Sequence, residues 1–251
     1  MLEIRGKYNT AIVYADQVEP SAIGQLTVLC SQPFIEGSTI RIMPDVHAGA
    51  GCVVGTTLTI KDKIVPNLVG VDISCALLVT KLNTKDIDCQ KLDVVIRERV
   101  PSGFSIREQI HSFAKEIDLD ALYCAEHVQQ QKGYRSIGSL GGGNHFIEID
   151  HDENTDEYYL VIHSGSRHLG LEIANWYQKI AIASRTEKIP PDLAYVHGED
   201  FEKYIHDMII VGHFADLNRK TMAHEILKGM KWKAVDQFTT IHNYIDTKNM
   251  I

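Results

Sequence analysis

The sequence lacks the features of several specialised protein classes. No apolar run approaches the roughly 20 residues of a transmembrane helix, and residues 1–7 show no apolar signal-peptide region. The five cysteines are scattered and odd in number, so no disulfide framework is indicated and a reducing, cytoplasmic location is expected. The formal net charge is −8, which argues against a protein that coats nucleic acid by bulk electrostatics. We therefore expect an ordinary globular protein with no membrane partner.

What the chain does contain is a balanced composition of 251 residues, 44% hydrophobic and 23% charged, enough for a sizeable core. Apolar periodicity predicts strands at 10–14, 38–43, 53–60, 146–150, 158–162 and 238–241. It predicts helices at 21–31, 86–100, 106–117, 120–131, 167–184 and 199–228. Because these elements do not alternate in regular βαβ units, we predict a mixed α/β or α+β fold with central, largely antiparallel β-sheets flanked by helices.

A first candidate site is formed by Asp72 and Cys75, which follow the apolar run 68–71. A carboxylate beside such a run is costly unless a cation or a full set of donors meets it. If a strand breaks into a tight turn here, the cysteine can face the same point as the aspartate. A hard oxygen and a soft sulfur then form half of a metal site. For this pair alone, a buried structural cysteine beside a capping aspartate is the commoner arrangement.

A second candidate is the glycine-rich stretch 138–143, which leads into Asn144, His145, Phe146, Ile147 and Glu148. Glycines allow positive φ and leave backbone N–H groups open to a phosphate or a crowded metal. The stretch is no Walker loop, because the Gly-Lys-Ser/Thr ending is missing. We expect Asn144 to bind phosphate oxygens and His145 to be a ligand at a strand start, whereas the alternative is a flexible glycine hairpin.

Histidine is abundant, with twelve residues, and is the commonest metal ligand. His163 and His242 each end an apolar strand beside a small or amide residue, as His145 begins one. Five candidate ligands result: Asp72, Cys75, His145, His163 and His242. They suffice for two metals if Cys75 bridges them, and two metals commonly grip a phosphoryl group. Ligand softness alone favours zinc, iron or cobalt over manganese.

Other polar residues are candidates for supporting roles. Asp45 and His47 lead from a strand into a small-residue loop, where they could bind metal directly, support the ligands by hydrogen bonds, or merely form a polar turn.

Phosphate and RNA candidates lie at helix positions. Ser166 and Arg167 open the helix 167–184, whose N-terminus is a natural anion site. Asn218 and Arg219 give the helix 199–228 a polar side that could face RNA.

Five segments carry a family resemblance: MPDVHAGAGCVVGTT, VGVDISCA, SLGGGNHFIE, HSGSRHLG and IHNYID. Together they resemble the serial motifs of the RtcB-type RNA ligases, in the family's order and over essentially the whole chain. The resemblance implies a GTP- and manganese-dependent enzyme of tRNA splicing or RNA repair. It implies joining of RNA ends that bear 3′-phosphate or 2′,3′-cyclic phosphate to 5′-hydroxyl ends, with an archease-type activator as a possible partner. Manganese replaces the softer metals because cellular supply, not affinity alone, decides loading.

The same resemblance implies specific roles for residues. It implies that the five candidate ligands coordinate two Mn²⁺ ions and that Cys75 bridges the two ions. It maps guanosine-nucleotide contacts onto residues 144–148 and onto His242 and Asn243. In the implied mechanism GTP guanylylates a histidine, the GMP passes to the RNA 3′-phosphate, and the 5′-hydroxyl then attacks. Ala76 replaces a family glycine.

The guanylylated histidine belongs to a C-terminal part of the family to which no residue here corresponds, so no catalytic histidine is assigned. We therefore expect residues 1–251 to form a single RtcB-like catalytic domain that is C-terminally truncated relative to the family. Ligation by this chain is expected to be weak or absent. Two alternatives stay open: a divergent metal- and nucleotide-binding module that does not ligate, and a dinuclear phosphoesterase acting on cyclic phosphate RNA ends.

Overall fold

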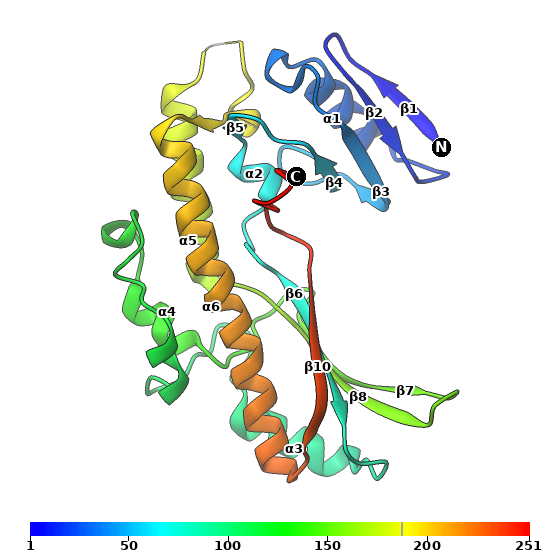
Figure 1. Ribbon diagram of the computed structural model, residues 1–251, viewed down its shortest axis with the longest axis vertical. Helices are drawn as coiled ribbons and strands as arrows, with labels where there is room; N and C mark the ends of the chain where they lie inside the picture. The colour runs from blue at the N-terminus through cyan, green and yellow to red at the C-terminus, as the bar shows by residue number, and fades with distance from the viewer. Residues whose placement is uncertain (187) are drawn as a thin grey trace. The chain divides into compact units, whose positions relative to one another are not determined.

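The computed structural model describes residues 1–186 and 188–251 (Figure 1). The chain forms two compact units. Unit 1 comprises Met1–Val71, Ala174–Ile205 and Ile245–Ile251, and unit 2 comprises Asp72–Ile173 and His206–Tyr244. All five candidate metal ligands belong to unit 2.

Unit 1 is built on a four-stranded sheet of order β1-β2-β3-β4, in which only the β2–β3 pair is parallel. Its strands are β1 (Leu2–Arg5), β2 (Thr10–Val13), β3 (Ile40–His47) and β4 (Val54–Leu58). Its other elements are α1 (Pro20–Cys30), η1 (Pro33–Ile35), α2 (Pro66–Val69), η4 (Pro191–Leu193) and the antiparallel pair β5 (Lys63–Ile64) and β9 (Val196–His197). Helix α1 buries Leu26 and Leu29 in the same core as Ile40 and Ile42.

Unit 2 contains an entirely antiparallel sheet of order β10-β6-β8-β7. Its strands are β6 (Ala76–Leu82), β7 (Phe146–Asp152), β8 (Glu157–Ser164) and β10 (Ala234–Ile241). The remaining elements are α3 (Cys89–Arg99), η2 (Ser112–Glu116), η3 (Ala125–His127) and α4 (Gln130–Ser136). Two long helices, α5 (Arg167–Ser184) and α6 (Glu199–Met230), contribute residues to both units.

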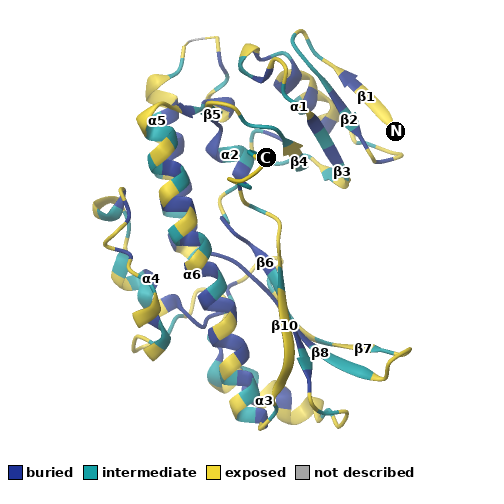
Figure 2. Cartoon of the chain, in the orientation of Figure 1, coloured by how far each residue is buried: buried dark blue, intermediate teal, exposed yellow. Residues whose placement is uncertain are grey.

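Alternation along β6 shows how this sheet is packed. Leu78 and Leu82 are buried together with Ile162 of β8, in a core completed by Val95 of α3 and Ile226 of α6. The alternate residues of β6, Leu77, Val79 and Lys81, point to the other face of the sheet and are only half-buried. This alternation is expected for an antiparallel sheet that covers a hydrophobic core with one face. Strand β10 lies at the sheet edge and is exposed along most of its length (Figure 2).

The predicted fold class is confirmed, because both larger sheets are largely antiparallel and helices accompany them. Helix α5 has the predicted bounds 167–184. Helix α6 begins at the predicted residue 199 and ends at Met230, slightly beyond the predicted end at residue 228. Among the described residues, no helix combines the length and apolar composition that crossing a bilayer requires.

Two predicted helices are wrong, and the apolar run 68–71 is no strand. Pro66 opens the short helix α2 and Gly70 leaves it at φ 92°. The strand of this region is β6, which begins after Cys75. Segment 106–117 contains only η2, and 120–131 only η3 and the start of α4. In the second case the Asp207 carboxylate accepts the backbone N–H groups of Tyr123 and Cys124, which replaces helical bonds.

Candidate metal centre

A tight turn brings the first two candidate ligands together. Ser74 adopts φ 57°, and the N–H of Cys75 donates to the carbonyl of Asp72 at 3.0 Å. This closure turns the aspartate and the cysteine towards one side before β6 begins. The predicted tight turn is therefore present, although it precedes a strand instead of ending one.

Strand register brings the three histidines to the same end of the sheet. Phe146, directly after His145, pairs with His163 across β7 and β8. The N–H of His242, directly after β10, donates to the carbonyl of Cys75 at 3.1 Å. Four chain segments that are far apart in the sequence thus meet beside the first residue of β6.

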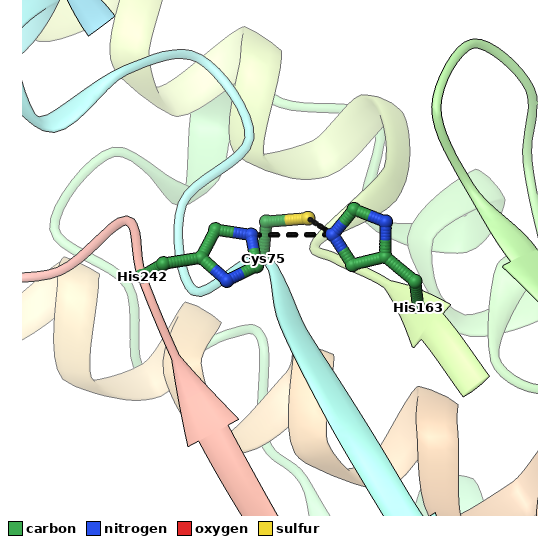
Figure 3. A group of neighbouring side chains, drawn as sticks. All are labelled: Cys75, His163 and His242. Atoms are coloured by element: carbon green, nitrogen blue, oxygen red, sulfur yellow. Dashed lines mark hydrogen bonds between the residues drawn. The ribbon is translucent and has the colours of Figure 1, made fainter. Parts of the chain in front are cut away.

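The donor atoms of these five residues converge into two groups of three. One group is Cys75, His163 and His242, and the other is Asp72, Cys75 and His145; within each, the donor atoms lie within 4.8 Å of one another. Cys75 Sγ lies 3.3 Å from His163 Nε2 and 3.6 Å from His145 Nε2. His163 Nε2 lies 3.2 Å from His242 Nε2, as Figure 3 shows. The thiol is the only atom shared by both groups.

Backbone carbonyls fix the orientation of two imidazoles. Nδ1 of His145 lies 2.9 Å from the carbonyl of Leu140, and Nδ1 of His163 lies 2.9 Å from that of Asn144. Since a carbonyl only accepts, each Nδ1 carries the proton in a neutral ring, and each Nε2 presents a lone pair to the centre. A carbonyl behind a histidine is the usual partner that orients a metal ligand.

A further contact of the centre joins Asp72 to His145, with Oδ2 and Nε2 2.8 Å apart. Oδ1 of Asp72 accepts from the N–H of Ser166 at 2.9 Å and from its hydroxyl at 3.2 Å. Gly165 lies directly against this carboxylate, where any Cβ would clash with both oxygens. One oxygen is therefore anchored by protein, and the other faces the histidine.

Burial and neighbouring groups shift the pKa values of three residues of the centre. Burial raises the pKa of Asp72, but the hydrogen bond and charge of His145 outweigh it and keep that pKa below its ordinary value. Burial, followed by the charge of Asp72, raises the pKa of the Cys75 thiol. Burial, followed by the charge of His163, lowers the pKa of His242. A bound divalent cation would reverse the direction for the thiol, because a coordinating thiol is deprotonated outright.

The donor set fits divalent cations. In a tetrahedral centre with bonds of about 2.1 Å, neighbouring ligand atoms lie about 3.4 Å apart. The contacts between 2.8 and 3.6 Å bracket that spacing. Three imidazoles, a thiolate and a carboxylate could hold two such cations, with the sulfur between them.

The predicted nucleotide contacts differ in their exposure. Asn144, Phe146 and Glu148 are exposed, whereas Ile147 packs against the core of unit 2. Phe146 lies against His163, with ring centroids 5.2 Å apart. Asn243 donates from Nδ2 to the carbonyl of Asp72 at 3.3 Å. The exposed three can meet a ligand through their side chains, and Ile147 can do so only through its backbone.

The candidate phosphate- and RNA-binding residues also differ in their exposure to solvent. Arg167 is half-buried, with Nε bonded to the Ser139 hydroxyl and Nη2 to the Gly103 carbonyl, and stays a candidate. Ser166, Asn218 and Arg219 are fully buried. Direct contact of Asn218 and Arg219 with RNA is therefore contradicted, because their polar groups face inward.

Two predicted supporting residues belong to unit 1. Asp45 and His47 are exposed on β3 of unit 1, where Nδ1 of His47 contacts the carbonyl of Asp45 at 2.7 Å. Their role beside a metal stays a prediction.

Sequence reasoning missed Gly165 and the carbonyl of Leu140. The glycine between two serines of HSGSR was visible in the sequence, but a backbone carbonyl leaves no side-chain signal.

Comparison with known proteins now assigns the family. The model of a family described as tRNA-splicing ligase RtcB matches residues 25–250. The chain belongs to the RtcB family. RNA-splicing ligase RtcB of Escherichia coli (strain K12) is 33% identical over an alignment that covers 91% of this chain and 64% of the relative. All five candidate ligands fall inside the RtcB match, so the resemblance inferred from the motifs is confirmed at the level of the family.

Archaeal relatives align over a similar part. tRNA-splicing ligase RtcB of Methanococcus maripaludis is 29% identical over 85% of this chain and 57% of its own length. The corresponding protein of Thermococcus kodakarensis is 28% identical, over 73% of this chain and 50% of its own length. The chain thus spans 50% to 64% of these RtcB relatives.

Proposed function

We propose that this chain is the metal- and nucleotide-binding part of an RtcB-type RNA ligase. Such a ligase would use Mn²⁺ and GTP to join RNA 3′-phosphate or 2′,3′-cyclic phosphate ends to 5′-hydroxyl ends, and residues 1–251 alone are expected to bind the metal and the nucleotide but to ligate weakly or not at all. The observation that carries the proposal is the convergence of five donor atoms from four chain segments, with Cys75 common to both groups of three. Membership of a family named for RNA splicing supports the choice of substrate.

In this proposal Cys75 would hold both ions, His163 and His242 would complete one site, and Asp72 and His145 the other. When bound, two divalent cations would neutralise charge on phosphate oxygens. The carbonyls of Leu140 and Asn144 keep the histidine lone pairs aimed at the centre. Asn144, Phe146 and Glu148 are exposed and would contact the guanosine nucleotide.

The first experiment measures binding. Mn²⁺ binding is followed by electron paramagnetic resonance and GTP binding by a fluorescent GTP analogue, with and without Mn²⁺. We expect two ions per chain and GTP binding that requires them. The matched control is Cys89→Ala, which removes an exposed thiol of α3 and should change neither measurement. Absence of Mn²⁺ binding by the wild type would contradict the proposal.

The second experiment measures chemistry on two RNAs, one ending in 2′,3′-cyclic phosphate and the other beginning with 5′-hydroxyl. Joined product that depends on GTP supports the ligase. The resemblance assigns the GMP-accepting histidine to no residue of the chain, so covalent GMP labelling is measured separately from GTP binding. Opening of the cyclic phosphate without GTP or joining would instead favour a phosphoesterase.

A further inference from the structure

Two adjacent residues of α6, Asn218 and Arg219, are fully buried in unit 2, close behind the metal centre. Buried polar groups are costly unless hydrogen-bonded, so their bonding partners show what they do. Neither side chain points to solvent, and neither belongs to the groups of donor atoms that could hold a metal.

Asn218 joins two of the segments that carry ligands. Its Oδ1 accepts from the backbone N–H groups of Gly138 at 2.8 Å and Ser139 at 3.1 Å. Its Nδ2 donates to the hydroxyl of Ser164 and to the carbonyl of Gly165, both at 3.3 Å. One amide therefore fastens the glycine-rich loop that precedes His145 to the end of β8.

The link continues to the ligands themselves. The hydroxyl of Ser164 donates to the carbonyl of Leu140 at 2.8 Å. The same carbonyl accepts from Nδ1 of His145 at 2.9 Å. A shift of the loop relative to β8 would therefore disturb the hydrogen bonds of the Leu140 carbonyl, which orients His145.

Arg219 joins a third segment. Its Nη1 donates to the carbonyl of Ser74 at 2.9 Å and to that of Ser164 at 2.8 Å. Ser74 lies in the turn between Asp72 and Cys75, and its N–H donates to the carbonyl of Asn243 at 2.6 Å. The guanidinium therefore holds the turn against the residue that follows His163, and the turn holds the segment that carries His242.

The other two nitrogen atoms of the Arg219 guanidinium are unpaired in the part of the chain that the structure describes. Nε and Nη2 are buried and have no hydrogen-bond partner among the described residues. Burying a guanidinium with two unpaired N–H donors costs free energy. The burial of Arg219 is therefore not explained by hydrogen bonding of its own donors alone. What its position does achieve is the bridge between two carbonyls on two ligand segments.

We propose that Asn218 and Arg219 are positioning residues that hold the ligand segments in the register needed for metal binding. The inference rests on the metal centre proposed above. The positioning role acts through backbone partners of the ligands, where substitutions typically weaken metal affinity about 10- to 100-fold.

The test uses Co²⁺ as the probe, because its visible and near-ultraviolet bands report coordination geometry and thiolate ligation. Asn218→Asp removes the two donor bonds and keeps the acceptor. Arg219→Lys keeps the charge but is too short to place a donor where Nη1 bonds the two carbonyls. We expect each to weaken Co²⁺ binding at least about 10-fold and to alter the thiolate band, with an unchanged far-ultraviolet circular dichroism spectrum. Thr221→Val is the matched control, since Thr221 is buried on α6 and its hydroxyl donates to the Leu217 carbonyl of its own helix, with no bond to a ligand segment among the described residues.

The outcomes distinguish failure of the metal centre from failure of the positioning role. If the wild type binds no Co²⁺, the metal centre fails and the positioning role fails with it. If the wild type binds and both variants match it in affinity and spectrum, only the positioning role is overturned. Should Asn218→Asp fail to fold, Ser164→Ala replaces it, because it removes only the hydroxyl that links Asn218 to the Leu140 carbonyl. Should Arg219→Lys fail to fold, Arg219→Gln replaces it, because the bonds of Arg219 to the Ser74 and Ser164 carbonyls come from its own side chain. Wild-type affinity and spectrum in the replacement variant would then overturn the role.

Discussion

Replacing Cys75 by alanine should remove both metal positions at once. Its sulfur is the one atom common to the two groups of three donors, so the variant leaves each group with two ligands. His163→Ala removes a ligand from one group only. We therefore expect two bound ions in the wild type, none in Cys75→Ala, and one in His163→Ala.

The size of the effect follows from linkage. An ion present at 100 times its dissociation constant stabilises the folded state by about 2.7 kcal/mol. Two ions give about 5 kcal/mol, which corresponds to a rise in melting temperature of about 10–20 °C for a chain of this size. The Cys75 side chain is 3% exposed, so replacing it by alanine also removes buried apolar volume. Counted as one buried methylene group, the sulfur contributes about 0.8 kcal/mol to the free energy of unfolding. The loss of metal stabilisation should thus exceed the packing loss several-fold.

The assay is calorimetric titration for stoichiometry, together with melting curves with and without metal. Cys75→Ala should melt at the same temperature in both conditions, and His163→Ala should keep about half of the wild-type shift. Equal stoichiometry in the two variants, or a metal-induced shift in Cys75→Ala, would refute the bridging role.

Other predictions concern packing and reactivity. Gly165→Ala should displace the Asp72 carboxylate and reduce the stoichiometry from two ions to one, as calorimetry can show; two ions at wild-type affinity would contradict the close approach. In the folded chain a small alkylating reagent should modify Cys89 alone among the five cysteines, and peptide mass spectrometry that finds a second modified thiol would disprove the assigned burial. Ile226→Ala in the core should cost about 2–5 kcal/mol in urea unfolding, whereas Ile209→Ala on the exposed side of the same helix should stay within about 0.5 kcal/mol; similar costs would contradict the packing of α6.

Periodic segments were predictable from the sequence because their signal is local. Helix α5 has the expected bounds, Arg167–Ser184, since its apolar positions repeat with helical spacing. The segment 106–131 was not predictable, because its backbone bonds to distant groups. Tyr123 and Cys124 donate to Asp207, which lies more than 80 residues later.

The candidate ligands were predictable one by one, but their supports were not. Each of His145, His163 and His242 lies at or near the end of a strand beside a small or amide residue, which a sequence displays directly. Asn218 and Arg219 are polar residues on a helix, and sequence alone gives such residues a solvent-facing role. Only the tertiary structure shows that they are buried and bonded to the backbone of the ligand segments.

A count of protons shows why these side chains do not form an ordinary hydrogen-bond network. Four contacts of the imidazoles join Asp72, His145, Cys75, His163 and His242, and a further contact joins the Cys75 thiol to the Asp72 carboxylate. With Nδ1–H of His145 and His163 directed at carbonyls, their Nε2 atoms carry no proton in the neutral rings. The thiol can supply one proton and His242 another, so at least two of the four contacts set lone pair against lone pair. The Asp72–His145 contact is one of these unless that imidazole is charged. If divalent cations bind as proposed, each of these four pairs consists of two ligands of one cation, and no proton is needed between them.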